Sequence, residues 1–268
     1  MIKKSTLIVL LCAIVAASGV YYLQWHKSKQ PAAPADTAKP AFTVKAADIV
    51  SFSISHPAQK GQPAIDFEKQ KGAWQIVQPV DTLADQPTAE GLVDQLAESR
   101  STETEAVTPD RRKEFGLDPP EASVEFRTSG GQKHTLLLGN KDFSGDDVYA
   151  IVDDQPKVSL LPLSLLTTAD KSLKDFRDMN VLHLDVEDVS SLNLKNSSGD
   201  LAVARDSKDS TQWNFTKPEK APADPDVVDA MLNAVSSARI SQIVSERPDN
   251  LARYGLANPA ITFTAVKN

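Results

Sequence analysis

The chain has 268 residues, of which 41% are hydrophobic and 24% charged, a composition typical of globular proteins and long enough for about two domains. Its formal net charge is −7 with acidic and basic residues interspersed, which argues against a nucleic-acid surface because that needs a basic patch. The single cysteine, Cys12, lies in the apolar N-terminal run, so the rest of the chain has no disulfide, zinc thiolate or cysteine nucleophile.

The first predicted element is a membrane anchor within residues 1–29. Lys3 and Lys4 precede the uncharged run Ser5–Leu23, which as a helix would span about 28 Å, close to the thickness of a bilayer core. A cleaved signal peptide with its apolar region at Thr6–Ala17 is the alternative. We favour the anchor because the apolar run continues to Leu23. We expect a single pass through the inner (cytoplasmic) membrane, with the bulk of the chain periplasmic or otherwise extracytoplasmic.

A linker and a first repeat follow the anchor. Residues 30–45 are rich in proline and alanine and predict an extended linker. Repeat unit 1 is predicted over residues 46–182 and opens with a strand, because Val50, Phe52 and Ile54 alternate with serines. Two further strands are expected to form a hairpin that turns at Lys71–Gly72, and the second of them ends before Pro79.

The next predicted element is a helix with one apolar stripe. Asp85 is a plausible N-terminal cap, and Ala89, Leu92, Val93 and Leu96 recur at the spacing of one helix face. This pattern predicts a helix packed on the sheet.

The rest of the first repeat is predicted to be strands and one short helix. Gly116 and Leu117 form a bend before Pro120, where a glycine suits a backbone that a side chain would obstruct. Strands are expected over Ala122–Phe126, His134–Leu138 and Val148–Val152, a helical segment over Leu160–Leu173, and a closing Phe176-Arg177-Asp178 motif.

Much of this pattern occurs twice. Trp213 stands 139 residues after Trp74, and further identities share that spacing. Among these pairs are Pro79 and Pro218, Asp85 and Asp224, Arg100 and Arg239, Gly116 and Gly255, Leu117 and Leu256, and Pro120 and Pro259. The sequence therefore predicts an α+β fold, a tandem repeat of mainly antiparallel sheet units, each with one or two packed helices, plus one N-terminal transmembrane helix.

Repeat unit 2, residues 183–268, lacks counterparts of the last strands, the second helix and Arg177 of the first repeat. We expect either that the sequence is truncated or that the second unit leaves a sheet edge open.

These landmarks resemble the domain-of-unknown-function family 4340 (DUF4340). The shared features are a strand tryptophan before a proline, an alanine-aspartate before a helix, the aromatic-Gly-Leu-x-x-Pro turn, a Leu-Gly at Gly139 and the Phe176-Arg177-Asp178 motif. The resemblance covers residues 46–179 fully and 186–268 in part. It implies a membrane-anchored bacterial cell-envelope protein associated with ABC-type transporter components related to gliding-motility systems. The family has no established catalytic residues, so the resemblance assigns none.

Candidate chemical groups are few, and each has a plainer structural interpretation. His183 and Asp185 lack further metal ligands, and no strained nucleophile turn accompanies the histidines. A loop with Asp142, Asp146 and Asp147 departs from the EF-hand pattern and predicts a solvated loop. Arg100 and Arg239 are expected to cap helix carbonyls or to pair with an acidic group. Trp74 and Trp213 are expected in the core and not as sugar-stacking platforms.

We therefore expect no catalytic residue, metal or cofactor. The predicted function is that of a non-enzymatic accessory or interaction component of an ABC-type transporter or gliding-motility-like envelope complex. The expected contacts are the membrane, through the N-terminal helix, and a protein partner in the envelope. The alternative is a protein that binds or remodels cell-envelope glycans. An exposed cleft with polar groups and aromatic rings would favour this alternative.

Overall fold

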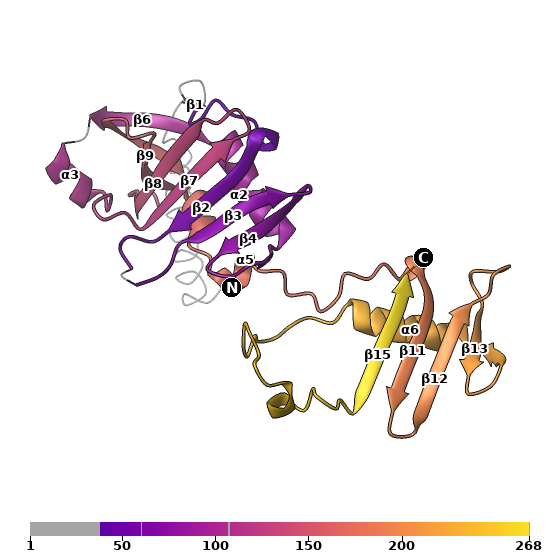
Figure 1. Ribbon diagram of the computed structural model, residues 1–268. Coiled ribbons are helices and arrows are strands. Elements are labelled where there is room, and N and C mark those ends of the chain that lie inside the picture. The colour runs from indigo at the N-terminus through magenta and orange to yellow at the C-terminus, as the bar shows by residue number, and fades with distance from the viewer. Residues whose placement is uncertain (1–37, 60, 107, 268) are drawn as a thin grey trace, which may run out of the picture. The chain divides into compact units, whose positions relative to one another are not determined.

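The computed structural model describes residues 38–59, 61–106 and 108–267, and its strands form two sheets (Figure 1). The described residues divide into two compact units. The first contains the residues up to Lys69 and Thr88–Lys171. The second contains Gln70–Pro87 and the residues from Ser172 onward. The prediction of mainly antiparallel sheet with a few helices is confirmed. The predicted anchor, residues 1–29, lies outside the described residues, and none of the described helices is long and apolar enough to span a membrane.

The first sheet has ten strands in the order β1-β6-β10-β9-β8-β7-β2-β3-β4-β5. Their bounds are β1 Lys39–Pro40, β2 Ile49–Ser55, β3 Ile65–Gln70, β4 Ala73–Gln78, β5 Thr82–Leu83, β6 Arg100–Ala106, β7 Ala122–Thr128, β8 Lys133–Lys141, β9 Asp147–Val152 and β10 Lys157–Pro162. The helices in this part of the chain are η1 Ala46–Asp48, α2 Gln86–Glu98, α3 Pro109–Glu114, α4 Leu163–Ala169 and α5 Leu173–Phe176. β1 and Phe42, which is buried, belong to the described part of the predicted linker.

The second sheet has five strands in the order β14-β13-β12-β11-β15. Its elements are η2 Val186–Asp188, β11 Val189–Asn196, β12 Gly199–Arg205, β13 Trp213–Lys217, β14 Ala221–Ala223, α6 Pro225–Ser236, η3 Leu251–Tyr254 and β15 Ile261–Lys267. α6 lies against one face of this sheet, where Val228 and Leu232 join a core with Trp213, Leu192 and Val203 (Figure 1).

Local sequence features explain where several of these elements begin and end. The β3–β4 hairpin turns at Lys71 (φ 51°) and Gly72 (φ 89°), the paired left-handed conformation that matches the twist of a two-residue hairpin. The predicted stripe of α2 is confirmed, since all four apolar side chains are buried. Asp224 caps α6 by accepting the N–H of Asp226, and Pro225 takes the first helical position, where a missing N–H costs no hydrogen bond.

The two sheets share strand order and register. The order β5-β4-β3-β2-β7 matches β14-β13-β12-β11-β15. Phe52 pairs with Phe126 and Ile54 with Val124 between β2 and β7, while Leu192 pairs with Ala265 and Leu194 with Phe263 between β11 and β15. These partners stand at the repeat spacing of 139 or 140 residues in both strands. Each pairing also carries a bulge just after its first residue, Ile49 or Val189.

Further backbone features recur at the same spacing. Pro79 and Pro218 both follow cis peptide bonds, and the bend glycines Gly116 and Gly255 have φ angles of 66° and 71°. Pro40 pairs with Arg100 in β1–β6, and Asn180 pairs with Arg239 in an isolated bridge. The equivalence between the two halves therefore reaches back to residues 40 and 180.

Two parts of the first sheet differ from the sequence-based expectation. Leu160–Pro162 belongs to β10, so the helix predicted from Leu160 begins only at α4. β6 was not predicted, because its sequence RSTETEA has no apolar alternation. β6 is held in the sheet by pairing with β1 and β10. These contacts are distant in sequence, so the local residue pattern does not predict them.

Candidate interaction site on the second sheet

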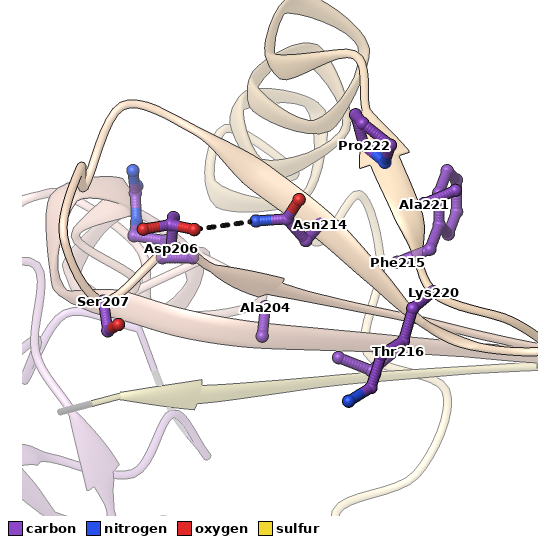
Figure 2. A pocket seen from close by; sticks show the side chains of 10 residues that line it. Ala204, Asp206, Ser207, Asn214, Phe215, Thr216, Lys220, Ala221 and Pro222 are labelled. Atoms are coloured by element: carbon purple, nitrogen blue, oxygen red, sulfur yellow. Dashed lines mark hydrogen bonds between the residues drawn. The ribbon is translucent and has the colours of Figure 1, made fainter.

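A concave pocket of 480 Å³ lies beside strands β12, β13 and β14 (Figure 2). Its lining combines charged, polar and apolar side chains: Ala204, Arg205, Asp206, Ser207, Asn214, Phe215, Thr216, Lys220, Ala221 and Pro222. None of these residues was a predicted site residue, and the segments that carry them show no recognisable motif. The pocket is chemically suited to a small polar molecule and contains no paired nucleophile and base.

Two of the charged side chains in the pocket, Asp206 and Arg205, make hydrogen bonds that stabilise the fold. Asp206 accepts a hydrogen bond from Asn214 Nδ2 at 3.2 Å and from the N–H groups of Lys208 and Asp209, which holds the turn after β12 (Figure 2). Arg205 donates to the carbonyls of Val186, Val189 and Ser210 at 2.6–2.9 Å.

The Arg205 guanidinium also lies 4.5 Å from the ring centroid of Trp213, a cation–π contact over the largest buried side chain of this sheet. Its donors are therefore committed to the core of the second sheet and not to a ligand.

The described histidines each have a carboxylate neighbour. His56 Nε2 lies 3.1 Å from the carbonyl of Ala169 and 3.6 Å from Asp170, while His134 Nδ1 lies 2.8 Å from Asp153. Within the described residues, the histidines contact backbone or carboxylate oxygens, and no serine hydroxyl is seen bonded to them.

His183 pairs with Asp178 and not with Asp185, whose carboxylate lies near Lys267. The structure therefore does not bring the two groups of the considered His183–Asp185 metal pair together. Within residues 38–59, 61–106 and 108–267, no group of three or more potential metal ligands is found.

The loop with three aspartates is held by hydrogen bonds to one of them. Asp142 accepts bonds from the N–H groups of Ser144, Gly145 and Asp147 and from the Ser144 hydroxyl, at 2.8–3.1 Å. Burial by itself raises the pKa of Asp142, and these hydrogen bonds outweigh it and lower that pKa. Burial, followed by the negative charges of Asp142 and Asp146, raises the pKa of Asp147. The carboxylate oxygens of Asp142 thus stabilise the turn by accepting hydrogen bonds from its backbone.

The two predicted arginines have backbone and amide partners. Arg100 begins β6 and donates Nε and Nη2 to the carbonyl of Ala38, at 3.2 and 2.9 Å, instead of capping a helix. Arg239 donates to the side-chain oxygen of Asn180 at 3.0 Å. Both therefore stabilise an extended backbone pairing at equivalent places in the two repeats.

Arg177 makes a two-pronged ion pair with Glu246. Its Nη1 and Nη2 lie 2.7 and 3.0 Å from the two carboxylate oxygens of Glu246. The hydrogen bond from Arg177 holds the pKa of Glu246 below its ordinary value of 4.5. The neighbouring Asp178 accepts from the backbone and side-chain nitrogens of Asn180.

The lowered pKa of Glu246 predicts a pH-dependent contribution to stability. The pair contributes above pH 4.5, the ordinary value, and the contribution is lost as the pH falls through the lower folded-state pKa. We expect Glu246→Gln to melt below the wild type at pH 6, and the difference to shrink as the pH falls below 4.5. The effect is small because the carboxylate is half exposed. Thermal melts of both proteins from acid to neutral pH measure it. A difference that stays constant over this range would contradict the assignment.

The two repeat tryptophans are buried in both sheets, whereas two buried apolar residues of the first repeat have exposed counterparts in the second. Trp74 and Trp213 are each 1% exposed. Leu117 is 2% exposed in the first repeat, whereas its counterpart Leu256 is 58% exposed. Ala122, fully buried at the start of β7, likewise corresponds to Ile261, which is 62% exposed at the start of β15.

This contrast identifies an exposed surface that we call the β15 edge: η3, the Gly255 bend and β15. It carries the exposed apolar side chains of Leu251, Tyr254, Leu256, Ile261 and Val266. β15 is the last strand of its sheet among the described residues.

Comparison with known proteins identifies one family. The family model described as "Domain of unknown function (DUF4340)" matches the chain over residues 74–212 and again over residues 213–268. No curated protein and no solved structure matches the chain.

Proposed function

The chain belongs to the DUF4340 family, with two consecutive matches to it, and from this premise we propose that it is a membrane-anchored, non-enzymatic interaction protein of the cell envelope. Its role is that of an accessory component of an ABC-type transporter or gliding-motility-like complex. The proposal includes a tandem duplication of one α+β module, an N-terminal helix within residues 1–29 that crosses the inner membrane once, and a periplasmic body.

The observation that carries this proposal is the structural role of the polar side chains in both repeats, whose hydrogen-bond partners lie within the fold, as for Asp142, Arg177 and Arg239.

The engagement of the polar groups supports an interaction role over catalysis. Several ionisable side chains are held in structural contacts, as Arg177 is by Glu246 and Asp142 by its own turn. A catalytic group needs free access to substrate, and these groups have their hydrogen-bonding capacity directed into the fold.

A glycan-binding role is the second candidate, because the pocket beside β13 gathers Asp206, Asn214 and Lys220. Sugar sites commonly add an aromatic platform. The pocket's only aromatic residue, Phe215, is half-buried and packs against the core of the second sheet. This favours the interaction role.

Purification of the tagged full chain from solubilised membranes of its host tests the proposal. We expect permease or ATPase subunits of an ABC-type transporter to co-purify and to be identified by mass spectrometry. Absence of transporter subunits, together with a saccharide that raises the melting temperature of the chain, would support the glycan role.

A further inference from the structure

The pocket beside β12, β13 and β14 lies where the two repeats differ. Ala204 on β12 is the counterpart of Glu68 on β3, because each lies opposite the equivalent serine of the neighbouring strand. Lys220 is the counterpart of Asp81, at the repeat spacing of 139 residues. The second repeat therefore has a methyl group where the first has a long carboxylate side chain, and a cation where the first has an anion.

The turn after β12 is a further difference. Asp206–Gln212 separates β12 from β13, whereas only Lys71–Gly72 separates β3 from β4. Ser207 of this longer turn and Ala204 of β12 both line the 480 Å³ pocket, a volume within the range of about 300–1,000 Å³ that is usual for small-molecule sites. The longer turn thus provides a wall beside a strand that the small alanine leaves open.

The first repeat shows that the later elements of the module do not cover this face. Glu68 and Asp81 are both exposed, although the first repeat contains β8, β9 and β10 after β7. Those strands extend the sheet beyond β7, on the side away from β3 and β4. Their counterparts Ala204 and Lys220 therefore belong to a face that a complete repeat leaves open to a ligand.

Charged groups stand at both ends of the pocket. Figure 2 shows Asp206 and Lys220 on opposite sides of Ala204. Lys220 is exposed and makes no hydrogen bond or ion pair with any residue that the structure describes. Asp206 accepts three hydrogen bonds from described residues, and a carboxylate can accept about four. With Arg205, the lining has two cations and one anion, a net positive charge in a chain of net charge −7. A ligand with a negative group for Lys220 and hydrogen-bond donors for Asp206 matches this lining.

We propose that this pocket binds a small hydroxylated carboxylate, the chemical class of the sugar acids. The carboxylate of the ligand pairs with the Lys220 ammonium, and its hydroxyl groups donate to Asp206 and exchange hydrogen bonds with Ser207 and Thr216. A neutral sugar lacks the group that pairs with Lys220, and an unsubstituted carboxylate lacks the donors for Asp206. Both ends of the ligand are therefore recognised. This binding site is additional to the proposed interaction role and does not depend on it.

Isothermal titration calorimetry of the 268-residue chain in detergent with sodium D-galacturonate tests the proposal. We expect saturable binding that weakens as salt is added, because salt screens exposed charges. Lys220→Asp should weaken binding at least about tenfold, a readily measured difference in affinity. Ala204→Glu should abolish binding, since it places a long carboxylate in the pocket. Both variants introduce the residue that the first repeat has exposed at that position, and melting curves confirm that they are folded. Lys195→Asp, the same charge change at an exposed position of β11 outside the lining, should leave binding unchanged.

Equal affinity for D-galactose would overturn the inference, because that sugar lacks the carboxylate. So would the absence of saturable binding, or binding that Ala204→Glu leaves unchanged. A galacturonate trimer separates two sources of the same chemistry: tighter binding than the monomer identifies a glycan chain, weaker binding identifies a free acid, and either result upholds the site. The proposed function is decided separately. Recovery of transporter subunits without acid binding removes the site and leaves that function, whereas acid binding without those subunits does the reverse.

Discussion

Trp213→Ala is expected to destabilise the second sheet by about 3–5 kcal/mol, the usual cost of truncating a fully buried aromatic side chain. Trp213 is 1% exposed and lies among Leu192, Val203 and Leu232. Alanine would leave a cavity between the sheet and α6. It would also remove the ring over which the Arg205 guanidinium lies and the indole N–H that donates to Asp229 at 3.3 Å.

The measurement is urea unfolding followed by circular dichroism and by methyl NMR signals of the second sheet. Since domains are stable by only about 5–15 kcal/mol, a loss of this size should shift the unfolding midpoint strongly or leave this sheet unfolded. Phe143→Ala is the control, because that ring is fully exposed and its removal should change stability by less than about 0.5 kcal/mol. A loss for Trp213→Ala as small as that of the control would show that Trp213 does not hold this core together.

Gly139→Ala is expected to destabilise the first sheet by about 1–3 kcal/mol or more, because the new methyl group has no room. Its nearest neighbours would be backbone atoms of Phe115 and Gly116, which cannot move aside as a flexible side chain could. Either β8 or the bend must shift, and the hydrogen bond from Asn140 N–H to the Phe115 carbonyl is lost with that shift.

Gly91→Ala is the matched control and should have the opposite sign. Gly91 lies within α2, and a Cβ built there meets nothing within 4 Å among the described atoms. Alanine should stabilise the helix by about 0.5–1 kcal/mol, since it has the higher helix propensity. Chemical denaturation of both variants compares them directly. If Gly139→Ala were neutral or stabilising, the close approach of β8 to the bend at Gly116 would be wrong.

The predictable parts of the fold were those in which a local pattern and the repeat agree. The stripe of α2 follows from helical periodicity, and the Lys71–Gly72 turn follows from the conformations that a tight hairpin requires. The position of Trp213 in the core follows from that of Trp74, since a duplicated sequence buries equivalent side chains. In each case one short-range physical rule was enough.

The elements that were missed depend on contacts distant in sequence. β6 is a polar strand that owes its place to β1 and β10. The pocket beside β13 lies in a hairpin whose residues share no motif, so only the folded chain brings Asp206 and Asn214 together. The bend at Gly116 was predicted, but the close approach of β8 to it required the coordinates of Gly139 and Phe115.

Residue-resolved amide hydrogen exchange of the 268-residue chain tests the central claim, that β15 pairs with β11 in the second sheet as β7 pairs with β2 in the first. In an antiparallel sheet alternate N–H groups face opposite neighbours, so a strand paired on both sides is protected throughout. We predict protection at every amide within β7 and, in β15, slow exchange only at the alternate amides that face β11. Uniform protection of Ile261–Lys267 in the monomeric chain, matching that of β7, would contradict the account.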